Sequence, residues 1–249
     1  MRNNLFCRKP IINVLLEPKK SSKVSSQLIY GEKFKIISRE KNYFKIKNLY
    51  DSYVGYIKID KYISNHEPTH KVKFIKSKIY LSKKGNISPS NSFLPFLSEI
   101  EILKSKKNLV MFEKNKWIKR KEILPINSKV NNFRKIFRLF LNCPYKWGGK
   151  SYKGIDCSAL IQMFYKYNRK FFPRDTIDQI KIKKGSKFKK KYSKGDIIFW
   201  KGHVAVCLNN RMLIHAYGPS KKVLIMPIKK TINIIRKTTK LKVKKIFSI

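Results

Sequence analysis

The chain has 249 residues, 42% hydrophobic and 13% aromatic, which is enough for one large domain or two to three small ones with real cores. Its 59 Lys and Arg residues outnumber 14 Asp and Glu residues, giving a formal net charge of +45. The four cysteines show neither a paired nor a C-x-x-C spacing, which excludes a disulfide framework and a cysteine-based zinc site.

The lysines are spread from Lys9 to Lys245 instead of forming one block. This spread is typical of compositional drift in an A+T-rich genome, although an anionic peptide substrate or, less specifically, nucleic acid would also favour a positive protein. The N-terminus lacks the apolar run of a signal peptide, and no segment reaches the ~18–20 apolar residues of a membrane span. We therefore expect a soluble, cytoplasmic protein with free thiols.

Short strand-like runs open the chain, at residues 11–16, 28–29, 34–37, 43–46 and 52–57. They predict a small β-barrel over residues 8–66, and similar runs at 79–81, 97–103 and 116–118 predict a second over 70–125. Both resemble bacterial SH3-like modules, the second mainly by its position and by Trp117. Glu67-Pro68-Thr69 separates the two as a linker, which places His66 and His70 at the surface.

An apolar stripe with basic residues opposite follows, formed by Phe133, Ile136, Phe137, Phe140 and Leu141. It predicts an amphipathic helix that packs on the sheet of a third domain, residues 128–249. A basic amphipathic helix can also lie on a membrane surface, but core packing is favoured.

The segment 144–160 places Cys157 between a Gly- and aromatic-rich loop and a second amphipathic helix. Asp156 and Ser158 are residue types that cap a helix start, so the thiol is expected on the first helical turn. The positive end of the helix dipole would stabilise a thiolate and lower the thiol pKa. Cys157 is therefore the candidate nucleophile, whereas Cys7, Cys143 and Cys207 are interpreted as buried apolar residues.

Two histidines lie downstream in an alternating region, which predicts consecutive antiparallel strands joined by short turns. If the hairpin closes around Asn209, His203 and His215 lie directly across from each other; a register different by one residue puts them on opposite faces. With His203 nearest the thiol, His215 can hold its imidazole in the productive tautomer. Beyond this hairpin we expect a short helix at 231–236 and a closing strand with the alternation Leu241, Val243 and Ile246-Phe247.

Six blocks run in order from Pro144 to about Ile228: Pro-Tyr-x-Trp-Gly-Gly, Gly-Ile-Asp-Cys-Ser, Pro-Arg-Asp-Thr, Gly-Asp-Ile-Ile-Phe-Trp, Gly-His-Val-Ala and Ile-His-Ala. Together they resemble the NlpC-type cell-wall peptidases, papain-like cysteine peptidases that cut peptidoglycan stem peptides. Ala159 stands where that family usually has glycine after Asp-Cys-Ser. The Pro173-Arg174-Asp175-Thr176 block is equally well interpreted as a purely architectural turn or as a substrate contact.

The resemblance implies Cys157 as nucleophile, His203 as general base and His215 as the orienting residue, with no metal and no cofactor. It also implies substrate-site roles for other residues: Tyr145 beside the oxyanion, and Asp156 and Ser158 lining the pocket. Trp147 and Trp200 could stack against substrate, although tryptophan is more often a core residue.

Tandem SH3-like modules and the missing signal resemble the subgroup that recycles murein peptides. By that resemblance the substrate is a free L-Ala-γ-D-Glu-diamino acid peptide, with diaminopimelate or Lys, cut after D-glutamate. Such peptidases need a free N-terminal amine, and a buried ammonium needs a carboxylate partner. Asp156 is one candidate and Glu32 with Tyr53 another, although Glu32 can equally be a surface turn residue.

The expected fold is thus α+β, a papain-like NlpC-type domain preceded by two small SH3-like barrels, acting as a monomer without nucleic-acid or membrane partners. Two alternatives stay open. One is an exported hydrolase that acts on intact murein. The other is a non-catalytic basic protein that binds an anionic polymer.

Overall fold

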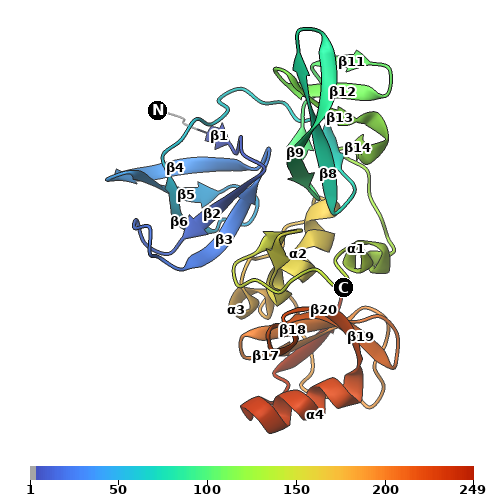
Figure 1. Ribbon diagram of the computed structural model, residues 1–249. Coiled ribbons are helices and arrows are strands. Elements are labelled where there is room, and N and C mark those ends of the chain that lie inside the picture. The colour runs from blue at the N-terminus through green and yellow to red at the C-terminus, as the bar shows by residue number, and fades with distance from the viewer. Residues whose placement is uncertain (1–3) are drawn as a thin grey trace. The chain divides into compact units, whose positions relative to one another are not determined.

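The computed structural model describes residues 4–249, which divide into two compact units (Figure 1). Unit 1 extends to Lys129 and also takes in the short segment Lys150–Tyr152. Unit 2 comprises Val130–Gly149 and Lys153–Ile249. The chain therefore leaves unit 2 for three residues, just before the candidate nucleophile.

Unit 1 begins with a six-stranded antiparallel sheet of order β1-β4-β5-β6-β2-β3. Its strands are β1 (Asn4–Phe6), β2 (Ile11–Leu15), β3 (Val24–Ile29), β4 (Lys33–Glu40), β5 (Tyr43–Asn48) and β6 (Val54–Lys58). Alternation of apolar and polar side chains buries one face. The core that results contains Cys7, Val14, Leu28, Phe34, Ile46 and Ile57. The predicted strands are confirmed, and so is the burial of Cys7.

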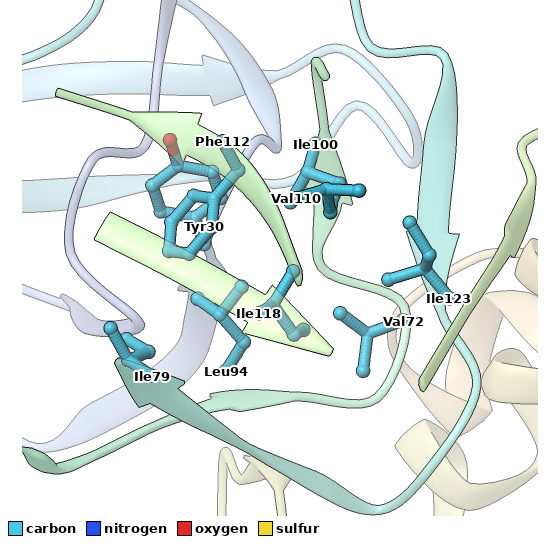
Figure 2. Packing of buried hydrophobic residues seen from close by; sticks show 9 residues of the cluster. All are labelled: Tyr30, Val72, Ile79, Leu94, Ile100, Val110, Phe112, Ile118 and Ile123. Atoms are coloured by element: carbon cyan, nitrogen blue, oxygen red, sulfur yellow. The ribbon is translucent and has the colours of Figure 1, made fainter. Parts of the chain in front are cut away.

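Two further sheets complete unit 1. The three-stranded one comprises β7 (His70–Val72), β10 (Glu99–Ile100) and β14 (Ile123–Pro125). The five-stranded one comprises β8 (Lys76–Lys83), β9 (Asn86–Pro95), β11 (Lys104–Lys106), β12 (Leu109–Glu113) and β13 (Lys116–Lys119), with a 3-10 turn at Arg120–Glu122. Figure 2 shows the shared core, in which Tyr30 from the first sheet region joins residues such as Val110 and Ile118.

Two expectations for unit 1 are wrong. The strand expected at 97–103 shrinks to Glu99–Ile100, because Leu97 adopts a left-handed backbone conformation (φ 64°) that turns the chain. His66 is buried (8% exposed) instead of lying at the surface. Its Nε2 lies 3.0 Å from the carbonyl oxygen of Glu99, and its ring packs edge-on against Phe6. The predicted linker is thus held against the protein.

Unit 2 is built on a five-stranded antiparallel sheet of order β20-β19-β18-β17-β21. The strands are β17 (Asp196–Trp200), β18 (His203–Cys207), β19 (Met212–Tyr217), β20 (Lys222–Pro227) and β21 (Lys245–Ser248). The helices are α1 (Phe133–Leu139), α2 (Cys157–Tyr167), α3 (Thr176–Gln179) and α4 (Ile228–Thr239), with a 3-10 turn at Gly218–Ser220. Two short strands, β15 (Lys150–Ser151) of unit 1 and β16 (Gly154–Ile155) of unit 2, precede α2.

Every residue of α2 is buried, and the helix packs against β18 and β19. Helix α1 buries its apolar stripe against α2, where Phe133 and Phe137 contact the ring of Phe164. The last helix is longer than the expected 231–236. The closing strand covers Lys245–Ser248, which confirms its part around Ile246 and Phe247 but not the part at Leu241 and Val243. Within residues 4–249 no helix is both long and apolar enough to cross a membrane.

Candidate active site

The register of the β18–β19 hairpin decides how the two histidines meet. The paired residues Val206–Ile214 and Cys207–Leu213 centre the hairpin on Asn210, so the centre expected at Asn209 is wrong. The shift moves each partner by two positions and therefore keeps both histidines on one face. They meet diagonally, with Nε2 of His203 2.9 Å from Nδ1 of His215.

Cys157 opens α2, as its sequence context predicts, and lies beside the strand that carries His203. Its Sγ lies 4.0 Å from the carbonyl oxygen of Gly202, and the backbone N–H of Val204 is directed at the sulfur. The thiol is therefore held against the backbone on both sides of His203. Because Nε2 of His203 is engaged with His215, Nδ1 is the ring nitrogen of His203 left for other partners.

Burial sets the protonation of all three groups. It raises the pKa of the Cys157 thiol to about 12, with the negative charge of Asp156 adding to the effect. It lowers the pKa of His203 to about 4 and, together with His203, that of His215 to about 3. The lowered thiol pKa expected from the helix start is thus reversed, since desolvation outweighs the N–H groups that favour the thiolate. The resting site holds a neutral thiol and two neutral imidazoles.

Aromatic rings fix the imidazole orientations. The His215 ring stacks on Tyr217, with centroids 4.8 Å apart and planes 12° apart. Trp200 lies beside His203 at 5.5 Å. Because its side chain is only 1% exposed, Trp200 is a core residue and not a stacking surface for substrate.

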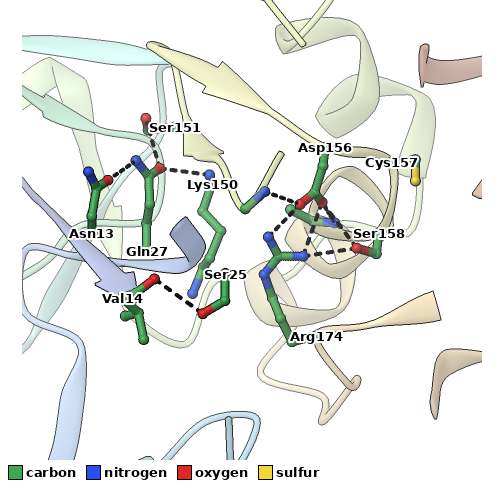
Figure 3. A network of polar contacts seen from close by, with 12 residues as sticks. Asn13, Val14, Ser25, Gln27, Lys150, Ser151, Asp156, Cys157, Ser158 and Arg174 are labelled. Atoms are coloured by element: carbon green, nitrogen blue, oxygen red, sulfur yellow. Dashed lines mark hydrogen bonds and ion pairs between the residues drawn. The ribbon is translucent and has the colours of Figure 1, made fainter. Parts of the chain in front are cut away.

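Asp156 caps α2 and is the centre of a buried polar network (Figure 3). Its Oδ1 accepts hydrogen bonds from the Ala159 N–H (2.8 Å) and the Ser158 hydroxyl (3.0 Å), and its Oδ2 from the Gly148 N–H (2.9 Å). Arg174, 2% exposed, binds both oxygens at 3.0 and 2.6 Å. A carboxylate offers about four lone-pair positions, so donors within the chain already occupy the acceptor positions of Asp156.

The buried position of Asp156 itself requires a countercharge, since an unpaired buried carboxylate is strongly disfavoured. The sequence pattern left Arg174 as either part of a turn or a substrate contact and did not indicate this partner. Arg174 also donates to the Ser158 hydroxyl at 2.9 Å. Arg174 therefore connects the 173–176 block by hydrogen bonds to the start of α2, the helix that begins at Cys157.

Glu32, in unit 1, is 2% exposed, so its interpretation as a surface turn residue is wrong. Its carboxylate accepts the Ile29 N–H at 2.9 Å and pairs with the ammonium of Lys150 at 2.9 Å. The Lys150 N–H donates to the Gln27 side chain at 2.8 Å, which Figure 3 also shows. Tyr53 is partly buried against the first core. The sequence pattern did not indicate Lys150.

Tyr145 and Trp147 flank the loop before Cys157. Burial, and next the nearby charge of Cys157, raise the pKa of the Tyr145 phenol, so it keeps its proton and can donate a hydrogen bond. Trp147 is 66% exposed and leaves a ring face free for contact. Among residues 4–249, no three His, Cys, Asp or Glu side chains are grouped so as to hold a metal ion.

Sequence comparisons place two families on this chain. Residues 142–240 match the NlpC/P60 family, and residues 14–61 match the bacterial dipeptidyl-peptidase Sh3 domain. Dipeptidyl-peptidase 6 of Lysinibacillus sphaericus is 40% identical over 81 residues, 31% of this chain and 28% of that protein. A gamma-D-glutamyl-L-lysine dipeptidyl-peptidase of Bacillus subtilis (strain 168) is 28% identical over 128 residues, 47% of this chain and 43% of that protein. The similarity thus spans less than half the length of either relative.

A crystal structure of an NlpC/P60 family protein from Bacillus cereus ATCC 10987 superposes with a TM-score of 0.77 at 17% identity. The superposition covers 90% of this chain and 94% of that one, and at this identity it shows the shared fold alone. Both comparisons agree with the papain-like arrangement of α2 against the β18–β19 hairpin. The chain therefore carries an NlpC/P60 domain, of the papain-like cysteine peptidase class, together with a bacterial SH3-type domain.

Proposed function

We propose that this protein is a cysteine peptidase that hydrolyses the γ-D-glutamyl-diamino acid bond of peptidoglycan stem peptides. The observation that carries the proposal is the 2.9 Å contact between His203 and His215, because His203 begins the strand that lies beside the Cys157 thiol. The relatives support this choice of bond, since two of them are gamma-D-glutamyl-L-lysine dipeptidyl-peptidases.

In this mechanism His203 takes the proton of Cys157 as the sulfur attacks the γ-carbonyl carbon of D-glutamate. Proton transfer during attack suits a site whose resting groups are neutral. A backbone N–H at the start of α2 and the Tyr145 hydroxyl stabilise the developing oxyanion. His203 then protonates the departing amine, and water hydrolyses the thioester.

The substrate is proposed to be the free peptide L-Ala-γ-D-Glu-diamino acid, with lysine or diaminopimelate, handled by a cytoplasmic monomer. The name dipeptidyl-peptidase supports cleavage two residues from a free N-terminus. Trp147 offers an exposed ring for contact with the peptide, and the buried Ser158 is expected to line the pocket. Asp156 and Glu32 already pair with Arg174 and Lys150, so a substrate ammonium would have to share either carboxylate.

We also propose that domains run from 8 to 66, 70 to 125 and 128 to 249, with residues 70–125 as a second SH3-like module. Two sheets with their own apolar core support this second module. Tyr30 of the first module contributes to that core, so the two modules should unfold together. Limited proteolysis read by mass spectrometry tests this: release of residues 8–66 as a separate stable fragment would contradict it.

The experiment is hydrolysis of L-Ala-γ-D-Glu-L-Lys and its diaminopimelate counterpart by the purified protein and by Cys157→Ala, read by mass spectrometry. We expect L-Ala-D-Glu and the free diamino acid from the wild type alone. The N-acetylated peptide, assayed in parallel, should resist cleavage; equal rates would overturn the free-peptide specificity. Cleavage of intact murein only would favour an exported hydrolase. Salt-sensitive polymer binding without hydrolysis would favour the non-catalytic alternative.

A further inference from the structure

A thioether lies at the far end of the histidine pair. Nε2 of His215 is 3.4 Å from Sδ of Met226, a residue of β20 whose cross-strand partner on β19 is Leu213. A thioether sulfur can accept a hydrogen bond but has no proton to donate. A hydrogen bond at this contact therefore requires the proton on Nε2 of His215.

The position of this proton determines which of the other ring nitrogens of His215 and His203 carry a proton. A neutral imidazole carries one N–H and one lone pair, so Nδ1 of His215 becomes an acceptor. The 2.9 Å contact then has to be donated by Nε2–H of His203. This leaves the lone pair of His203 on Nδ1, the ring nitrogen that His215 does not occupy.

The opposite arrangement is disfavoured at both ends. It would point a lone pair of His215 at the lone pairs of the Met226 sulfur. It would also use the lone pair of His203 on Nε2 and put its proton on Nδ1, so that no base would remain to accept the Cys157 proton. Stacking on Tyr217 holds the His215 ring in place, so the ring cannot swing away from the sulfur without losing that contact.

We propose that Met226 is a positioning residue that fixes the proton arrangement of the His215–His203 pair and so presents the free lone pair of His203 to Cys157. The catalytic consequence rests on the proposed function; the proton arrangement itself does not. Burial keeps both imidazoles neutral near pH 7, so their tautomers are well defined there. No other residue is needed to select between the two arrangements.

The test is two-bond ¹⁵N–¹H correlation NMR of the histidine side chains at pH 7.5. We expect protonated Nε2 and unprotonated Nδ1 for both His203 and His215 in the wild type. Met226→Leu, similar in size but without an acceptor, should give mixed tautomers at His215. Met226→Glu, whose carboxylate accepts only, should restore protonation at Nε2. A wild-type spectrum with the proton on Nδ1 of His215 would overturn the proposal, whether or not the variants fold.

Kinetics provide the second readout. Met226→Leu should lower kcat by about three- to tenfold with little change in KM, the range for loss of one modest hydrogen bond that biases a two-state equilibrium. Met212→Leu is the matched control, because it removes a thioether from the same sheet at a position that pairs with Pro227. Equal effects of the two substitutions, or unchanged tautomers in Met226→Leu, would contradict the assignment. If no peptide is cleaved but the tautomers are as expected, the proposed function fails and the proton arrangement stands.

Discussion

His203 and His215 make the stability of unit 2 depend on pH. Their folded-state pKa values, about 4 and about 3, lie below the ~6.5 of an unfolded histidine. The unfolded chain therefore binds protons more readily as pH falls below ~6.5. The stability contribution is complete above that pH and is lost as pH falls toward 4. Each histidine can cost up to about 1.4 kcal/mol per pH unit in this window.

We therefore expect the free energy of unfolding of unit 2 to fall steeply between pH 6.5 and 4.5. Urea unfolding followed by tryptophan fluorescence measures it, in a Trp117→Phe background so that the signal comes from Trp147 and Trp200 in unit 2. His215→Asn should remove about half of the slope. A free energy independent of pH across this window would show that the imidazoles are not held neutral.

At the scale of single residues, those whose position depends only on their neighbours in the sequence could be predicted. Cys157 at a helix start and Asp156 as its cap are read from neighbouring residues, and the structure confirms both positions. Arg174 and Lys150 could not be identified in the same way. Their carboxylate partners lie 18 and 118 residues away in the chain, so the pairing depends on tertiary contacts.

Among the elements, helix α2 depends most directly on a charge pair. Arg174→Met would leave the Asp156 carboxylate buried without a countercharge, which costs about 3–5 kcal/mol of stability. Asp156→Asn combined with Arg174→Met should recover part of this loss, because a neutral asparagine still caps a helix. Urea unfolding of the wild type and these variants gives the values.

Arg236→Met supplies the matched control for this prediction. Arg236 is exposed on α4, so the same substitution removes the same charge without leaving a buried carboxylate. It should change stability by less than about 0.5 kcal/mol. Similar losses for Arg174→Met and Arg236→Met would mean that the buried pair does not support α2.

The β18–β19 hairpin shows where a sequence pattern stops being sufficient. Alternation predicted both strands, but the register depends on the turn, where the Asn209 side chain accepts the N–H groups of Arg211 and Met212 at 2.8 Å each. Similarly, the Gly-Gly loop is evident in the sequence but the reason for Gly149 is not. A Cβ there would lie 2.3 Å from the carbonyl oxygen of Gly154. Close approaches of this kind belong to tertiary structure.

At the scale of the whole molecule, the net charge of +45 lowers the stability of the compact folded state. With 59 basic and 14 acidic residues, most lysines have no carboxylate to pair with, and like charges repel in the folded state. Added salt screens this repulsion, since the Debye length shortens from ~30 Å at 0.01 M to ~10 Å at 0.1 M. The excess charge is thus expected to make the protein more stable as ionic strength rises.

Thermal unfolding at increasing NaCl tests whether that charge is only a composition effect. Screening of a spread charge should raise Tm by about 2–4 °C between 0.02 and 0.2 M, equivalent to about 1 kcal/mol.

Sodium phosphate and polyphosphate at matched ionic strength serve as controls, because screening depends on ionic strength and not on the identity of the anion. Equal shifts in all three would assign the charge to composition. A much larger shift with polyphosphate alone would indicate that the folded protein binds a phosphate polymer, because binding to the folded state alone stabilises it by mass action. The second result would contradict this prediction and favour the polymer-binding alternative.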